Sequence, residues 1–185
     1  LREACRQAQV WEQRRRSATP LTLTVNVSGY QLQYEGVVGD VRSALADSGL
    51  DPHRLVLEIT ESVLMQQNET ILERLRALKA VGVRLAIDDF GTGYSSLGYL
   101  QRFPIDILKI DKAFVDDIGA TGVEPALVRA IIALGDTLQL QTIAEGIELK
   151  QQWHGLQELG CEMGQGFLFA RPVSVMQIDA MFGGP

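Results

Sequence analysis

Apolar residues recur along this chain in two alternating patterns, one with the period of a helix and one typical of a buried strand. Residues 1–16 carry apolar side chains on one helical stripe, and the β-branched run at Leu21–Val27 predicts the strand that follows. Helical spacing returns after Val38 and ends at Gly49, a residue that commonly terminates helices. The first part of the chain is therefore predicted as helix, strand, helix.

The same alternation continues to the end of the chain. The later predicted strands are short apolar runs between turn residues, and they cover Arg54–Thr60, Val83–Ile87, Ile105–Ile110, Leu140–Ala144 and Gly164–Phe169. Each is followed by helical spacing, with helices that end at Gly82, lie around Ser95–Gln101, span Leu127–Leu138, end at Gly160 and occupy Ser174–Phe182. Strict alternation of strands and helices is typical of parallel strands joined by helical crossovers.

Two α/β architectures fit this alternation. The first is a (β/α)8 barrel, and the second is a doubly wound open sheet. The sheet is less favoured because no Gly-rich phosphate loop follows an early strand. A barrel has eight strands, whereas this chain begins on a helix and offers six. We therefore expect one domain over residues 1–185, a TIM-type barrel that lacks its N-terminal strands.

Composition narrows the range of partners. The net charge of −6 and the pI of about 4.9 disfavour duplex nucleic acid. No apolar run approaches the roughly 18–20 residues of a membrane span. Cys5 and Cys161 lie far apart in apolar surroundings, so we expect buried, reduced thiols. A phosphate-bearing ligand would need a metal ion to offset the carboxylates.

Polar residues stand at the ends of the predicted strands, where (β/α) barrels carry their chemistry. In chain order they are Asn26, Glu58 with Glu61, Asp88 with Asp89, Lys109 with Asp111, Glu145 with Glu148, and Gln165 near the start of the last strand. Any one of them alone is as well explained by a solvated strand end or a helix cap. Converging carboxylates repel each other unless a counter-charge is present. Hard divalent cations with oxygen ligands, Mg²⁺ or Mn²⁺, supply one.

Two features of this rim bear on its chemistry. Neighbouring strand residues point to opposite faces, so Asp88 and Asp89 share a site only if their strand is ending there. The residues that follow, Phe90–Gly93, indicate that it is ending, so both carboxylates are expected to reach metal ions. Two metal ions held close together are well suited to displacement at a phosphodiester. Lys109 would then stabilise negative charge or position water. The alternative interpretation is that Lys109 only forms a structural salt bridge to Asp106 or Asp111. His53 and His154 lie outside the strand ends, so a zinc site rich in histidine is disfavoured.

Six short motifs, in order along nearly the whole chain, carry a family resemblance. They are Val25–Ser28 (VNVS), Glu58–Glu61 (EITE), Asp88–Leu97 (DDFGTGYSSL), Leu108–Asp111 (LKID), Glu145–Glu148 (EGIE) and Gln165–Phe169 (QGFLF). Together they resemble the EAL-type cyclic di-GMP phosphodiesterases. The resemblance implies a barrel of the EAL kind that hydrolyses cyclic di-GMP to linear pGpG with two Mg²⁺ or Mn²⁺ ions.

The resemblance also implies roles for individual residues. The metal ligands would be Asn26, Glu58, Asp88 and Glu145, with Asp89 holding or bridging to the second ion. Lys109 would contact the attacking water, and Glu145 or a neighbouring carboxylate would help to take its proton. Glu61 would anchor the loop after Asp89. The substrate-binding residues would be Asp111, Gln165, Phe169 and Pro172.

Partners and cellular context are implied in the same way. The Asp88–Leu97 loop and the helix after it resemble the dimerisation element of the family, so a homodimer is expected. A sensor or GGDEF domain upstream is also expected, and so is a cytoplasmic location, including the cytoplasmic part of a membrane-anchored sensor.

Two other functions stay open at this point. The Glu of the motif that names the family lies upstream of this chain, and Glu3 is not that residue because it sits on a helix pattern. A cyclic di-GMP receptor without hydrolytic activity is therefore the alternative function. A lyase on a similar barrel is a further one, but a Schiff base at Lys109 is disfavoured because neighbouring carboxylates keep it protonated.

Overall fold

The computed structural model describes residues 1–15, 19–65, 68–92, 100–118 and 125–182. The chain divides into two compact units, each considered by itself. The first comprises the described residues of 1–58, 68–85 and 172–185, and the second those of 59–67 and 86–171. Across these described ranges, no helix has both the length and the apolar character required to span a bilayer.

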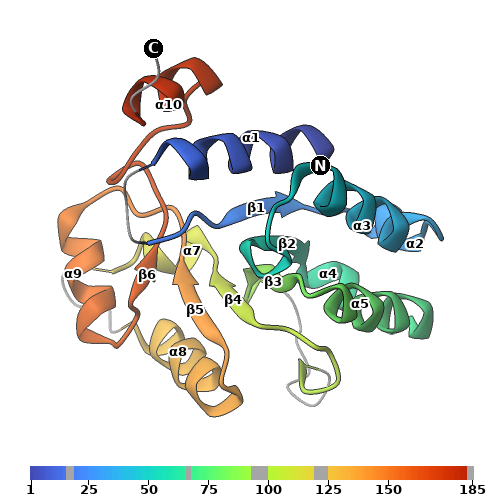
Figure 1. The fold of residues 1–185 in the computed structure, drawn as a ribbon. Coiled ribbons are helices and arrows are strands. Elements are labelled where there is room, and N and C mark those ends of the chain that lie inside the picture. Colours follow the sequence, from blue (N-terminus) through green and yellow to red (C-terminus); the bar gives the residue numbers. More distant parts are fainter. Residues whose placement is uncertain (16–18, 66–67, 93–99, 119–124, 183–185) are drawn as a thin grey trace. The chain divides into compact units, whose positions relative to one another are not determined.

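The first unit contains a parallel pair of strands and several helices (Figure 1). Leu23 stands opposite Leu55 and Asn26 opposite Glu58 in the β1–β2 pair. The elements in chain order are α1 (Arg2–Arg14), β1 (Leu23–Asn26), α2 (Gly29–Gln33), α3 (Val37–Ser48), the 3₁₀ turn η1 (Pro52–Arg54), β2 (Leu55–Thr60, as far as Glu58), α5 (Glu69–Val81), the first residues of β3 (Arg84–Phe90) and α10 (Val175–Met181).

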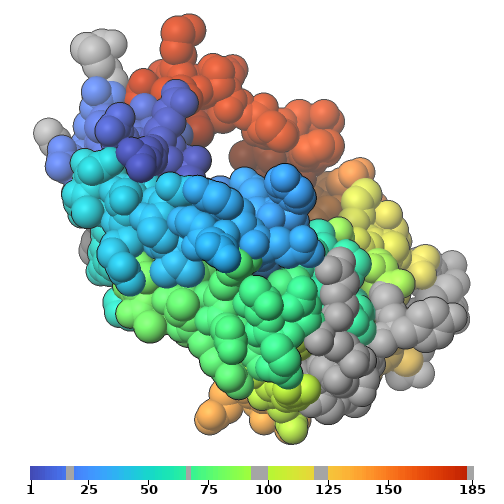
Figure 2. All heavy atoms as spheres, turned by 90° about the vertical axis from the view of Figure 1, so that its right-hand side faces the viewer, coloured from blue at the N-terminus to red at the C-terminus, as the bar shows by residue number. Residues whose placement is uncertain are grey.

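The helices of this unit pack on one another. Helix α1 buries Cys5 and Ala8 and contacts α3, which in turn lies beside α5 (Figure 2). Helix α10 is tied to α1 because the indole N–H of Trp11 donates to Asp179 over 2.8 Å. Helices α3 and α5 end at glycines with left-handed backbone, as the sequence predicted, at Gly49 (φ 70°) and Gly82 (φ 103°).

The second unit is a run of parallel strands with helices between them. Strands β3 to β6 pair in succession, and α8 packs on β4 and β5 (Figure 1). Its elements are the end of β2, α4 (Glu61–Leu64), β3 from Ala86, β4 (Ile107–Ile110), α7 (Lys112–Val115), α8 (Ala126–Leu138), β5 (Gln141–Ala144), α9 (Lys150–Glu158) and β6 (Met163–Gly164). Every residue of β4 is buried, which is typical of a parallel strand covered on both faces.

Two predicted strands have different bounds in the structure. Strand β3 continues past Ile87 to Phe90, because a bulge between these residues lets it pair with β4 again. The prediction of a strand over Gly164–Phe169 is wrong, since β6 ends at Gly164. At Gly166 the chain turns against the backbone of Ile147, so closely that a Cβ atom would overlap it. Gln165 therefore follows its strand instead of standing near its start.

The remaining predicted elements are present with ends shifted by up to two residues, apart from the short helix around Ser95–Gln101. That helix lies mostly outside the described residues. The short helices α2, α4 and α7, which the hydrophobic pattern did not predict, start within three residues of the ends of β1, β2 and β4.

Candidate functional site

Lys109 is the centre of a charged cluster in the second unit. Its side chain projects from β4 and is 3% exposed. The Nζ atom lies 2.8 Å from Oδ1 of Asp88, on β3, and 2.6 Å from Oε1 of Glu145, which follows β5. An oxygen of Asp88 and one of Glu145 also lie within 4.8 Å of each other. Three neighbouring strands thus bring these charges together.

Burial explains why these charges are paired. An ammonium group without water around it is strongly destabilised unless carboxylates neutralise it. The salt bridge considered from the sequence, to Asp106 or Asp111, differs from the two ion pairs described here, because Asp88 and Glu145 project from the strands on either side of β4.

The bulge in β3 gives Asp88 and Asp89 different environments. Asp89 has left-handed backbone, with φ 55°. The pKa of Asp89 is raised, first by partial loss of solvent, then by the charge of Asp88 and by a hydrogen bond with Asp111. Both aspartates therefore contribute negative charge to one region, although the strand does not end at Asp88.

A cleft of about 330 Å³ adjoins the cluster. Its walls hold more acids than bases, and the lining residues are Asp89, Asp111, Lys112, Glu145, Gly146, Glu148, Gln165, Gly166 and Phe167. Gln165 is fixed by its backbone, since its N–H donates to Ala144 and its carbonyl accepts from Ile147. The structure thus brings Asp89, Asp111, Glu145 and Gln165 to one cavity.

The roles of the other two predicted substrate residues, Phe169 and Pro172, remain predictions. Phe169 packs edge-on against Trp153, with ring centroids 5.5 Å apart, and is outside the described lining of the cleft. Pro172 belongs to the first unit. The aromatic ring in the cleft is that of Phe167, which is half-exposed, with the guanidinium of Arg171 4.8 Å from its centroid. The sequence analysis missed Phe167, although the QGFLF motif contains it.

Glu61 contacts the backbone just after the aspartate pair. Its carboxylate accepts a hydrogen bond from the Gly91 N–H over 2.8 Å, and the residue is 3% exposed. The contact holds the start of the segment that follows Phe90. The rest of that segment, residues 93–99, lies outside the described part of the chain.

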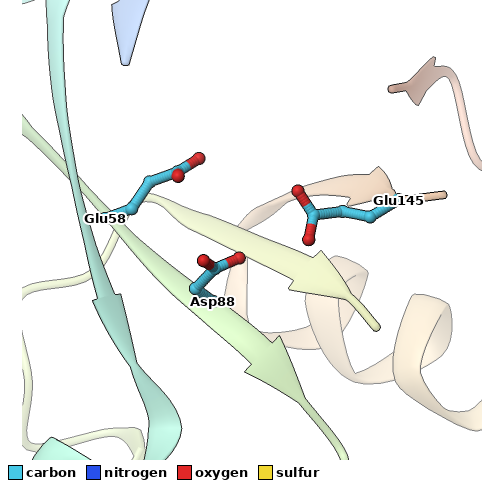
Figure 3. A group of neighbouring side chains, drawn as sticks. All are labelled: Glu58, Asp88 and Glu145. Atoms are coloured by element: carbon cyan, nitrogen blue, oxygen red, sulfur yellow. The ribbon is translucent and has the colours of Figure 1, made fainter. Parts of the chain in front are cut away.

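Asn26 and Glu58 form a second pair of oxygen donors, in the first unit. Asn26, the last residue of β1, stands opposite Glu58 of β2, and the N–H of Val27 donates to the Glu58 carbonyl over 2.8 Å. Asn26 is exposed, whereas Glu58 is buried. Figure 3 shows the side chains of Glu58 on β2, Asp88 on β3 and Glu145 just after β5.

The donor atoms fit a hard divalent cation. Asp88 and Glu145 offer carboxylate oxygens close enough together to share an ion, and Asp89 adds a third carboxylate nearby. Mg²⁺ and Mn²⁺ prefer such oxygen ligands, whereas zinc sites are usually rich in histidine and cysteine. The cluster therefore has the chemistry of a magnesium or manganese site.

Comparison with known proteins identifies the family. The model of the EAL domain matches residues 1–172. MucR of Pseudomonas aeruginosa, a bifunctional diguanylate cyclase/cyclic di-GMP phosphodiesterase, is 44% identical over 180 residues, which are 97% of this chain and 26% of MucR. The chain spans 20% to 28% of the length of the curated relatives that it matches best.

Solved structures agree. The PaMucR phosphodiesterase in complex with c-di-GMP has a TM-score of 0.88 and 44% identity, over 96% of this chain and 71% of that one. BlrP1 of Klebsiella pneumoniae, in a manganese/c-di-GMP complex, has a TM-score of 0.82 and 33% identity, over 92% of this chain and 43% of that one. The predicted fold class is confirmed: α/β, with parallel strands, of the type found in EAL structures. This chain belongs to the EAL domain family.

Proposed function

We propose that the protein carrying this chain hydrolyses cyclic di-GMP to linear pGpG with the help of divalent metal ions. The observation that carries this proposal is the buried ammonium of Lys109 held between Asp88 and Glu145. A cation and two carboxylates at neighbouring strand ends suit phosphodiester hydrolysis, which needs both charge stabilisation and a proton acceptor. The family membership of the chain supports the same reaction, since MucR is named as a cyclic di-GMP phosphodiesterase.

Two ions, Mg²⁺ or Mn²⁺, are part of the proposal. As the family resemblance implies, the metal ligands would be Asn26, Glu58, Asp88 and Glu145, and Asp89 would hold the second ion or bridge to it. Oxygen donors at each of these positions support the assignment, as does the manganese complex of BlrP1. When bound, such ions would neutralise the carboxylates and polarise the phosphodiester.

Lys109 and Glu145 would have different roles in the hydrolysis. Lys109 would orient the attacking water and stabilise the negative charge that develops on the phosphate. Glu145 would accept a proton from that water. The water oxygen forms the new P–O bond while the bond from phosphorus to the 3′ oxygen breaks. The leaving oxygen takes up a proton, and the product is linear pGpG. The 2.6 Å contact between Lys109 and Glu145 supports this pairing of roles.

The cleft beside the cluster would bind the nucleotide. Gln165 and Asp111 offer hydrogen-bonding groups there, and the half-exposed ring of Phe167 offers a stacking surface for a base. Phe169 and Pro172 would also bind the nucleotide, as the family resemblance implies. The acidic lining explains why metal ions would be required to bind the phosphates.

Wider assembly is proposed on the same basis. One EAL domain over residues 1–185 would pair with a second copy through the Asp88–Leu97 loop and the helix after it. Residues 93–97 of that loop lie outside the described residues. An upstream sensor or GGDEF domain is supported by the bifunctional MucR, and a cytoplasmic location would follow from the substrate.

A direct assay tests the proposal. The longest natural polypeptide that carries this chain is incubated with cyclic di-GMP and Mn²⁺ or Mg²⁺, and pGpG is separated by chromatography. We expect release of pGpG that a chelator abolishes and that Asp88→Asn lowers at least about 100-fold. Asp136→Asn, an exposed position on α8, is the matched control and should retain full activity. Saturable binding without product would instead establish the receptor function.

A further inference from the structure

Gln152 is a buried polar side chain that the proposed mechanism does not use. Among the described residues, four polar or charged side chains are buried: Glu58, Glu61, Lys109 and Gln152. The first three belong to the motifs discussed above. Gln152 lies outside those motifs, on α9, and is 4% exposed. Burying an amide is unfavourable unless it forms hydrogen bonds, so the contacts of Gln152 indicate what it does.

The Oε1 atom of Gln152 accepts two hydrogen bonds from consecutive backbone N–H groups. The donors are Glu148 and Leu149, each at 2.9 Å. Leu149 is the N-cap of α9, and its side chain has no oxygen to accept from the first turn. Gln152, at the third helical position, therefore reaches back and fixes the backbone that enters the helix.

These hydrogen bonds hold the segment that carries Glu145. The N–H of Glu145 donates to Ile110 over 3.1 Å, and that of Ile147 donates to Gln165 over 3.1 Å. The next two N–H groups, of Glu148 and Leu149, donate to Oε1 of Gln152. The backbone is thus fixed on both sides of Gly146, whose left-handed φ of 67° turns the chain after Glu145.

The position of this segment decides where the Glu145 carboxylate lies. Glu145 approaches Lys109 to 2.6 Å and Asp88 to within 4.8 Å, so a small shift of the turn would move it out of the cluster. We propose that Gln152 is a positioning residue that holds the Glu145–Glu148 turn and thereby keeps Glu145 in place to bind a divalent ion. This inference rests on the proposed function for the identity of the ion.

The experiment compares three variants of the longest polypeptide that carries the chain. Gln152→Met keeps the shape of the side chain but removes the acceptor, whereas Gln152→Glu keeps an acceptor oxygen. Gln151→Met makes the same change at the adjacent, exposed residue of α9 and serves as the matched control. Mn²⁺ affinity is measured by calorimetry without nucleotide, and exchange of the Glu148 and Leu149 amide protons by NMR.

We expect Gln152→Met to weaken Mn²⁺ binding about 10-fold or more, which is typical when a residue that orients a metal ligand is lost. The Glu148 and Leu149 amide protons should exchange faster in the same variant. Gln152→Glu should recover most of the affinity, and Gln151→Met should match the wild type. With nucleotide present, kcat should fall more than KM rises, because the contact acts on Glu145 and not on the substrate.

Two results would distinguish an error in the Gln152 inference from an error in the proposed function. If the wild type binds Mn²⁺ and Gln152→Met binds it equally well, despite faster amide exchange, Gln152 caps α9 only and the inference is wrong. If the wild type itself binds no Mn²⁺ and releases no pGpG, the proposed function is wrong, and the positioning role toward a metal falls with it.

Discussion

Lys109 and Glu145 approach each other to 2.6 Å, and three residues further along each segment Lys112 and Glu148 form a second ion pair at 3.1 Å. The inner pair is largely buried, whereas the outer pair is about half exposed. The inner pair joins β4 to the chain after β5, and the outer pair joins α7 to the same segment. The inner pair carries the proposed chemistry, and both residues of the outer pair line the cleft.

Replacing Lys109 should destabilise the protein as well as inactivate it. Lys109→Met leaves Asp88 and Glu145 close together without the cation between them, and removing one partner of a buried pair costs about 3–5 kcal/mol. We expect a loss of about 3 kcal/mol in the free energy of unfolding, measured by urea titration in chelator. Lys150→Met, on the exposed start of α9, should change it by less than about 0.5 kcal/mol. Equal effects of the two substitutions would contradict the role of the buried pair.

Gly146 should tolerate no side chain while Lys112 is present. A Cβ atom at Gly146 would overlap the Cβ, Cγ and Cδ atoms of Lys112, and its φ of 67° disfavours other residues. Gly146→Ala should therefore destabilise the protein by more than the roughly 1–2 kcal/mol of the left-handed backbone alone. The free energy of unfolding is measured for both single variants and for the double variant.

Shortening the lysine should relieve part of that cost. In the Gly146→Ala background, Lys112→Ala removes Cγ and Cδ, so we expect a coupling energy of about 0.5–3 kcal/mol. Lys112→Met keeps Cγ and places its sulfur where the lysine has Cδ, so it is the control, for which no relief is expected. Additive behaviour of Gly146→Ala with Lys112→Ala would show that the overlap does not determine the cost.

The hydrogen bond from Gly91 to Glu61 should stabilise the segment after the aspartate pair. Glu61→Met removes the acceptor and leaves the Gly91 N–H without that partner, which costs about 1–3 kcal/mol. Glu61→Gln retains an oxygen and should lose less than half as much. Glu73→Met, on the exposed side of α5, is the matched control. Thermal unfolding measures the effect, and a Gln variant as unstable as the Met variant would indicate that charge, not the acceptor, matters.

Asp89 should make the metal-free protein less stable as pH rises. Its pKa in the folded protein lies above the ordinary value of 3.8, so folding favours the protonated acid. The contribution is therefore favourable below pH 3.8 and is lost as pH rises through the folded pKa. In chelator, Asp89→Asn should raise the melting temperature at pH 7 by at most about 4 °C, since Asp89 is exposed.

The pH dependence provides the control for that prediction. At pH 3.5 the wild-type carboxyl is mostly protonated, so the variant and the wild type should unfold at nearly the same temperature. Added Mn²⁺ should remove the advantage of Asp89→Asn at pH 7, because a bound cation compensates the charge of Asp88 and Asp89. A stabilisation that is independent of pH would contradict electrostatic repulsion as its cause.

Much of the fold follows from local patterns. The glycines at 49 and 82 end helices because their backbone is left-handed, and the run at β4 is apolar because both faces are buried. The bounds of β3 and β6 were not predictable in this way. A bulge at Asp89 and the turn of Gly166 against Ile147 depend on the neighbouring strand and segment, which a local pattern does not reveal.

The chain's own sequence determined the alternation of strands and helices, the acidic strand ends and the family, because these depend on residue type and spacing. Only the tertiary structure decided which carboxylates pair with Lys109 and that the ring of Phe167 lines the cleft beside them. Such contacts join residues far apart in the chain. Their partners are selected by strand register and by the need to neutralise buried polar groups, and both are properties of the folded chain.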